Sequence, residues 1–181
     1  LTHINIPEGT INIGSGAFSN CINLVSANVP SSIKNIENNV FYNCTKLKTL
    51  VIPNDVISIG DFAFFNCNSL KSAISLTSIE SIGSSTFSDC SELTTIVLPA
   101  TVKSIGNNAF LGCTNLTTVT VPSSSVWSHL KALNSIKNVT ILGDSKSITQ
   151  SDFAGLKNLK SVTIGNNVKS IGDSTFSGCT G

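Results

Sequence analysis

Six cysteines carry the side chains best suited to nucleophilic, redox or metal chemistry in this sequence, because a thiolate is both a nucleophile and a metal ligand. They recur at one position of a repeating pattern: Cys21, Cys44, Cys67, Cys90, Cys113 and Cys179. In adjacent repeats two of them would lie about 5 Å apart, which is within disulfide range. One copy of the pattern has Leu156 here, however, and a position that accepts leucine is a packing position. We therefore expect buried, reduced thiols, with disulfides between neighbouring copies as the alternative.

Other motifs for catalysis or for a bound cofactor are weak. Ser31-x-x-Lys34 and Ser128-x-x-Lys131 have the Ser-x-x-Lys spacing of serine acylases, but a serine-rich chain produces such matches by chance. The sequence has no Cys-x-x-Cys pair and only two histidines, which argues against a metal site. It also lacks phosphate-binding, dinucleotide-binding and calcium-binding loops. The sequence therefore predicts no enzyme activity, no cofactor and no metal.

The cysteines belong to a repeat that phenylalanine marks most clearly. Phenylalanines recur at intervals of 23 residues, first in a series of five and then in a pair: Phe18, Phe41, Phe64, Phe87 and Phe110, then Phe153 and Phe176. The cysteine follows three residues after the phenylalanine, and a leucine commonly follows three residues after that. A period of this length is typical of solenoids, in which stacked units bury a core that one unit cannot bury alone.

Cutting the chain at these leucines divides it into eight units. Seven units have 23 residues and one has 20; their bounds are 1–23, 24–46, 47–69, 70–92, 93–115, 116–135, 136–158 and 159–181. Because the chain holds a whole number of units, we expect a single repeat domain taken from a longer array.

Each unit predicts a strand, a turn and a short helical turn. Its opening L-x-x-φ-x-φ, where φ is apolar, alternates as a half-buried strand does, and a proline often ends it. In unit 47–69, Gly60 then predicts a sharp turn and Asp61 a helix N-cap. The following A-F-x-x-C-x-x-L has the spacing of a helical turn with one buried face. Equivalent strands stacked at about 4.8 Å form a parallel sheet.

The 23-residue pattern with A-F-x-x-C-x-x-L resembles that of the BspA-like (Treponema pallidum type) leucine-rich-repeat family over the whole chain. The resemblance implies an α/β repeat solenoid: a right-handed superhelix with a parallel sheet on its concave face and short helices or 3-10 turns on its convex side. It also implies a surface protein of anaerobic bacteria or mucosal parasites that adheres to host cells or to matrix proteins such as fibronectin. The family has no catalytic residues to transfer.

Two places depart from the pattern. Unit 116–135 lacks A-F-x-x-C, and Trp127, Leu130 and Leu133 at helical spacing could cover its core instead, either in a variant coil or as a contact for a partner. In strand 70–76 the apolar residues are shifted by one position, which predicts a bulge.

A partner would contact the outward positions of the strands, which are the second, third and fifth of each unit. In the central units these are Lys48, Thr49, Val51, Lys71, Ser72, Ile74, Thr94, Thr95, Val97, Thr117, Thr118 and Thr120. Val51, Ile74 and Val97 would form an apolar stripe bordered by polar residues, as at a protein interface. The alternative is that these β-branched residues only favour the strand.

Two asparagines in Asn-x-Thr sequons, Asn115 and Asn138, are candidate glycosylation sites, although a chain rich in asparagine and threonine also produces sequons by chance.

Composition limits the remaining functions. The 181 residues have a formal net charge of +1 and no basic cluster, which argues against nucleic-acid binding. No apolar run is long enough to span a bilayer. We therefore expect a non-catalytic recognition or adhesion module at the cell surface or outside the cell, which binds a host or matrix protein. An intracellular interaction scaffold is the alternative, and uncapped solenoid ends could self-associate.

Overall fold

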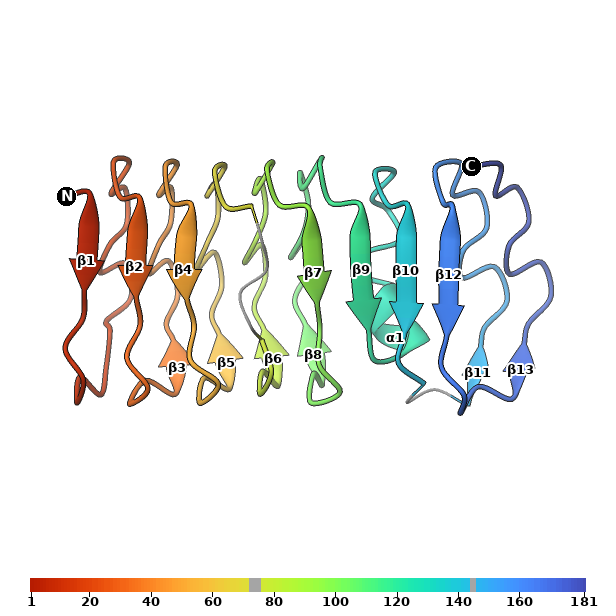
Figure 1. Ribbon diagram of the computed structural model, residues 1–181, viewed down its shortest axis with the longest axis horizontal. Helices are drawn as coiled ribbons and strands as arrows, with labels where there is room; N and C mark the ends of the chain where they lie inside the picture. Colours follow the sequence, from red (N-terminus) through yellow and green to blue (C-terminus); the bar gives the residue numbers. More distant parts are fainter. Residues whose placement is uncertain (72–75, 144–145) are drawn as a thin grey trace.

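The computed structural model describes residues 1–71, 76–143 and 146–181. The chain forms one elongated solenoid of parallel strands, as Figure 1 shows. This confirms the predicted repeat solenoid with a parallel sheet. The right-handed path of the solenoid and a concave curvature of the sheet stay predictions.

The strands predicted at the start of the units form one row, the strand face. Its sheets have the orders β1-β2-β4 and β7-β9-β10-β12. The strands are β1 (His3–Asn5), β2 (Ser26–Asn28), β4 (Thr49–Val51), β7 (Thr95–Val97), β9 (Thr118–Val121), β10 (Asn138–Ile141) and β12 (Ser161–Ile164). Residues 72–75, where we expect a bulge, lie outside the described part of the chain. The register pairs equivalent repeat positions, such as Ser26 with Thr49 and Thr118 with Asn138.

A second set of parallel strands lies where the sequence predicts only a turn. These short strands are β3 (Asn35–Ile36), β5 (Ser58–Ile59), β6 (Ser81–Ile82), β8 (Ser104–Ile105), β11 (Ser147–Ile148) and β13 (Ser170–Ile171). They form the sheets β3-β5-β6-β8 and β11-β13. A glycine follows four of these strands, β5, β6, β8 and β13, and each of these glycines lies close to the backbone of the preceding coil. A Cβ on Gly83 would lie 2.5 Å from the backbone nitrogen of Asp61 in the preceding coil.

The remaining side of each coil, the turn side, consists of tight turns where the sequence predicts short helices or 3-10 turns. Cys44 N–H donates to Phe41 C=O at 3.2 Å, and Leu47 N–H donates to Cys44 C=O at 2.9 Å. Between these turns, Asn43 has a φ of 58°, which a right-handed helix cannot accommodate. The one helix in the described residues is α1 (Ser124–Trp127), in the irregular unit.

The predicted helix N-caps are therefore wrong, and their side chains bridge neighbouring coils instead. Asn38 Oδ1 accepts from Asp61 N–H at 2.8 Å, and Asp61 Oδ1 accepts from Ser84 N–H at 2.6 Å. These residues tie each coil to the following one.

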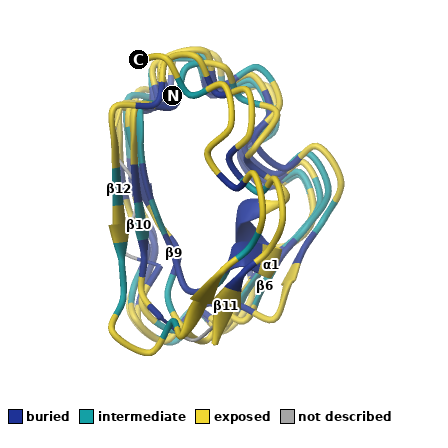
Figure 2. Cartoon of the chain, turned by 90° about the vertical axis from the view of Figure 1, so that its right-hand side faces the viewer, coloured by how far each residue is buried: buried dark blue, intermediate teal, exposed yellow. Residues whose placement is uncertain are grey.

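The core contains two columns of stacked aromatic rings, one from Phe18 to Phe110 and one from Trp127 to Phe176. Phe41, Phe64 and Phe87 are almost fully buried, and their ring centroids are 5.5 and 5.3 Å apart. In the irregular unit Trp127 is fully buried and stacks against Phe153 at 4.9 Å. Figure 2 shows α1 inside the coil outline, on the side opposite the strand face. Trp127 and Leu130 cover the core as predicted, because both are 0% exposed, whereas Leu133 is partly buried and packs against the core.

Candidate interaction surface

The strand face alternates between buried and exposed side chains as predicted. Leu50 and Ile96 point into the core and are 8% and 1% exposed. Their neighbours Val51 and Val97 are 61% and 49% exposed, although both are large and apolar. Val51 and Val97, the two outer residues of the expected apolar stripe, are therefore both exposed. The middle residue Ile74 and the neighbouring contact residue Ser72 lie outside the described residues.

Rows of threonine run across the strand face because the strand register aligns equivalent repeat positions. Thr95 pairs with Thr118 in such a row, whereas the apolar Val97 pairs with Thr120. The predicted residues Lys48, Thr49, Lys71 and Thr94 are exposed, and Thr95, Thr117, Thr118 and Thr120 are half-buried. Two of the threonine hydroxyls already donate to the main chain, Thr94 to Lys71 C=O at 3.0 Å and Thr117 to Thr94 C=O at 3.5 Å.

Lysines give the strand face a positive charge. Lys71 has one carboxylate neighbour, Glu92, at 3.4 Å, in a pair that is well exposed to solvent. Lys48, Lys137 and Lys160 are exposed and have no ion pair within the described ranges.

A shallow hollow of about 520 Å³ lies on the same face, over the first three strands. It is lined by His3, Ile4, Asn5, Ser26, Ala27, Asn28, Thr49 and Val51. His3 Nδ1 and Ser26 Oγ are hydrogen-bonded at 2.7 Å, and Asn28 Nδ2 donates to Asn5 Oδ1 at 3.4 Å. Of these residues the sequence predicts only Thr49 and Val51 as contacts. Ser26 and Asn28 occupy the same outward positions, which is the signal that could have found them.

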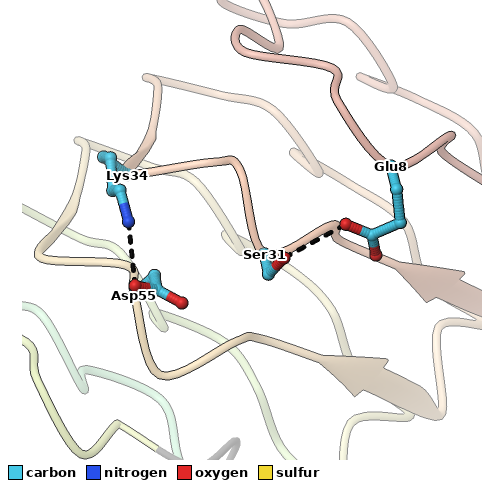
Figure 3. A network of polar contacts seen from close by, with 4 residues as sticks. All are labelled: Glu8, Ser31, Lys34 and Asp55. Atoms are coloured by element: carbon cyan, nitrogen blue, oxygen red, sulfur yellow. Dashed lines mark hydrogen bonds and ion pairs between the residues drawn. The ribbon is translucent and has the colours of Figure 1, made fainter.

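The Ser-x-x-Lys pairs are not arranged for acyl transfer, which needs the serine to be activated by its base. Ser31 Oγ donates to Glu8 Oε2 at 3.1 Å in the preceding coil, whereas Lys34 Nζ donates to Asp55 Oδ1 at 2.8 Å in the following one. Figure 3 shows the two side chains directed to these separate partners. Ser128 Oγ donates to Ser125 C=O at 2.6 Å.

The cysteines are free thiols that pack in the core, as predicted. Cys44, Cys67, Cys90 and Cys113 are 0% exposed. Each of these thiols donates to the phenylalanine carbonyl of the preceding coil, as Cys90 does to Phe64 at 3.2 Å. Burial raises the pKa of Cys44 and of Cys113 to about 12, and it raises the pKa of Cys67 and Cys90 as well. A protonated, enclosed thiol is a poor nucleophile and a poor metal ligand.

Other kinds of site find little support. Within the described ranges, no three His, Cys, Asp or Glu side chains gather in a group that could hold a metal ion. None of the helices there has the length and apolar character needed to cross a membrane. The candidate glycosylation residues Asn115 and Asn138 are both exposed, and Asn138 belongs to β10 on the strand face. Modification at either asparagine stays a prediction.

Comparison with protein families gives one match. The model described as a BspA type leucine rich repeat region, in six copies, matches residues 1–117 and 128–181. The unmatched stretch covers β9 and α1, so the sequence departs from the family where the fold departs from the regular coil. No curated protein matches the chain.

Solved structures with the same fold come from several bacteria. The leucine-rich-repeat protein of Treponema pallidum is 30% identical over 99% of this chain and 71% of its own, with a TM-score of 0.61. A leucine-rich-repeat protein from Bacteroides ovatus is 27% identical over 99% of this chain and 47% of its own length, with a TM-score of 0.71. A leucine-rich cell surface protein from Faecalibacterium prausnitzii is 27% identical over 99% of this chain and 45% of its own length, with a TM-score of 0.62. This chain thus spans less than half the length of the last two proteins.

Proposed function

Because this chain belongs to the BspA-type leucine-rich-repeat family, we propose that it is a non-catalytic recognition module at the cell surface, which binds a host or matrix protein through its strand face. Proteins of this family and fold are generally non-catalytic binding proteins. The similarity to a protein described as a cell surface protein supports the proposed location.

One observation carries the proposal: the strand face exposes large apolar side chains within rows of threonine and lysine. Val51 and Val97 are about half exposed or more on a face whose other described outward residues are mostly polar. An apolar centre with a polar rim is the usual composition of a protein interface. The lysines of this face favour a partner with acidic groups, so its affinity should fall as salt rises.

The free thiols are compatible with a location outside the cell. Cys44, Cys67, Cys90 and Cys113 are buried and hydrogen-bonded, and their pKa values are raised. Oxidation needs an accessible thiolate, which these positions do not offer.

The proposal is tested by binding of the purified, monomeric chain to immobilised fibronectin and to intact epithelial cells. Replacing Val51 and Val97 by serine should weaken saturable binding about tenfold, as expected for a central apolar contact. Replacing Ile11 and Ile57 by serine is the matched control. These side chains are 83% and 44% exposed, but they lie outside the strand face.

The monomer must be isolated first, because self-association through Ile171 and Phe176, which are exposed in the last coil, would compete for the surface. Equal loss in both double variants would contradict recognition by the strand face. Binding to neither surface would contradict the adhesive role and favour the alternative of an intracellular interaction scaffold.

A further inference from the structure

The turn side carries a main-chain hydrogen-bond ladder that joins each regular coil to the next. Three N–H groups of one coil donate to three carbonyls of the following coil. Between two central coils these bonds are Ser85 to Asn107 at 2.9 Å, Phe87 to Ala109 at 2.8 Å and Asp89 to Leu111 at 2.7 Å. This ladder resembles a parallel sheet, although its residues are in turns.

The ladder stops at the irregular unit. The equivalent N–H groups of the next coil belong to Asn108, Phe110 and Gly112, and none of them has an acceptor in the part of the chain that the structure describes. On the far side of unit 116–135, the carbonyls of Gln150 and Ala154 likewise have no donor among the described residues. Two edges with complementary hydrogen-bonding groups therefore face each other across the irregular unit.

The middle rung is filled by a side chain. Trp127 Nε1–H donates to Asp152 C=O at 2.9 Å, the position at which a regular coil would supply a backbone N–H. The indole thereby occupies the core side of the space between the two edges. The Gly112 N–H and the Ala154 C=O still have no hydrogen-bond partner among the described residues.

An open notch adjoins Gly112, and the other three open positions, Asn108, Gln150 and Ala154, are exposed. One hollow of about 480 Å³ separates residues 111–114 from residues 132–135, and a second of about 360 Å³ is lined by Asn134, Gly155, Lys157 and Asn158. Asn134 lines both hollows, and together they form one notch whose walls are residues 111–114 and residues 155–158. The irregular unit between these walls has 20 residues instead of 23.

The walls expose main chain because they carry glycine. At the position two residues after phenylalanine, the first coils have Asn20, Asn43 and Asn66, whose amides bond to one another at 2.9 and 2.7 Å. Gly112 and Gly155 occupy this position at the notch, both with a φ of +77°. They leave the N–H and C=O groups beside them uncovered.

The size of the notch and its charge define the ligand. Parallel strands are spaced about 4.8 Å apart, so a single extended chain placed midway would reach both edges. Lys157 lines the notch and Lys131 lies in the irregular unit; both are exposed and have no ion pair in the described ranges.

We propose that the notch binds an extended, acidic peptide segment of a partner protein, which completes the interrupted ladder. Its carbonyls accept from Asn108 and Gly112 N–H, and its N–H groups donate to Gln150 and Ala154 C=O. This is strand addition to an open edge, with affinity from the main chain and selectivity from Lys157. The site is on the turn side, so it is independent of the strand face.

The test uses the fluorescent octapeptide Ser-Val-Asp-Val-Asp-Thr-Asp-Ser and the whole chain, followed by anisotropy. We expect a dissociation constant of about 0.1–1 mM, the range of a short peptide held by a few hydrogen bonds. The same peptide with alternate backbone nitrogens methylated should not bind, because it cannot complete the ladder. Binding of the methylated peptide with equal affinity, or no binding of either at about 5 mM, would overturn the proposal.

Two variants locate the site. Lys157→Glu should weaken the octapeptide about fivefold or more, whereas Lys160→Glu, at an exposed position of the strand face, should not change its affinity. Replacing residues 122–135 by a copy of residues 99–115 would restore a regular coil and should abolish binding. Equal affinities in Lys157→Glu and Lys160→Glu would overturn the proposed site even where the regularised chain fails to fold.

Discussion

The regular coils and the irregular unit differ in how they bury apolar side chains and in how they provide hydrogen-bond partners for the backbone at the turn side. A regular coil does so with a phenylalanine, a cysteine whose thiol bonds to the preceding coil, and a main-chain ladder. Unit 116–135 has no equivalent phenylalanine, cysteine or second strand, and Trp127 supplies a buried aromatic ring and one hydrogen bond, to Asp152 C=O of the following coil. The difference teaches that the strand face and the buried core continue through the irregular unit, whereas the turn-side ladder is interrupted there.

The largest effect should come from removing the tryptophan. Trp127→Ala deletes a fully buried ring and leaves Asp152 C=O without its donor, so we expect a loss of about 4–6 kcal/mol in unfolding free energy. Phe87→Ala, in a regular coil that keeps its main-chain ladder, should lose about 3–5 kcal/mol. Urea denaturation measures both changes.

Trp127→Phe is the matched control, because it keeps an aromatic ring and removes the indole N–H; we expect a loss of about 1–2 kcal/mol. If Trp127→Ala destabilises the chain by less than about 1 kcal/mol, the indole is not the element that replaces a regular coil.

A smaller effect should come from the glycine that follows the second strand in several regular coils and is absent from unit 116–135. An alanine at Gly83 would place its Cβ 2.5 Å from Asp61 N and 2.6 Å from Gly60 C, both of them backbone atoms that cannot move freely. We expect Gly83→Ala to lower the unfolding free energy by about 2–3 kcal/mol.

Gly14→Ala is its control, because a Cβ there meets no atom within 4 Å and the residue has no positive φ. Thermal denaturation compares the two, and similar melting temperatures would contradict close packing of the second sheet.

The last effect depends on pH and concerns the thiols, which only regular coils possess. Unfolded thiols ionise near pH 9.0, whereas Cys44 and Cys113 in the folded chain ionise near 12. The unfolded state therefore loses protons first. Stability from this source is fully present below pH 9.0 and is lost as pH rises towards 12, by about 1.4 kcal/mol per pH unit for each thiol.

Urea midpoints measured between pH 8 and 10.5 test this slope. Cys67→Val with Cys90→Val should make it shallower, because two buried thiols are removed. An unchanged slope in the double variant would show that other groups cause the loss of stability.

Much of the fold follows from the repeat in the sequence. The spacing of phenylalanine, cysteine and leucine predicts the stacked strands, the buried thiols and the alternation of Leu50 with Val51, because these depend on periodicity alone. Trp127 is predicted in the core from its spacing to Leu130. The strands and their alternation recur along the chain, so each copy of the pattern reinforces the others.

The turn side could not be predicted in the same way. A-F-x-x-C-x-x-L has helical spacing, but Asn20, Asn43 and Asn66 take a positive φ that no spacing rule reveals. The second sheet was missed because its strands have two residues each and depend on pairing between coils. Asn38 and Asp61 resemble N-caps in sequence, and only the stacking shows that they bond to the next coil. The unpaired Gly112 N–H and Ala154 C=O could not be predicted either, because they depend on the hydrogen-bonding groups that unit 116–135 does not provide.

Native-state amide hydrogen exchange tests most directly whether the solenoid is continuous on its strand face and interrupted on its turn side. Leu98 and Leu142 N–H bond to β9 across the irregular unit at 2.9 Å each, and Ser85 and Asp89 N–H bond to the next coil on the turn side. We predict slow exchange for these four amides and exchange about 100-fold faster for Asn108 and Gly112. Equal protection of Asn108, Gly112, Ser85 and Asp89 would contradict the account, because it would mean that the turn-side ladder also continues through unit 116–135.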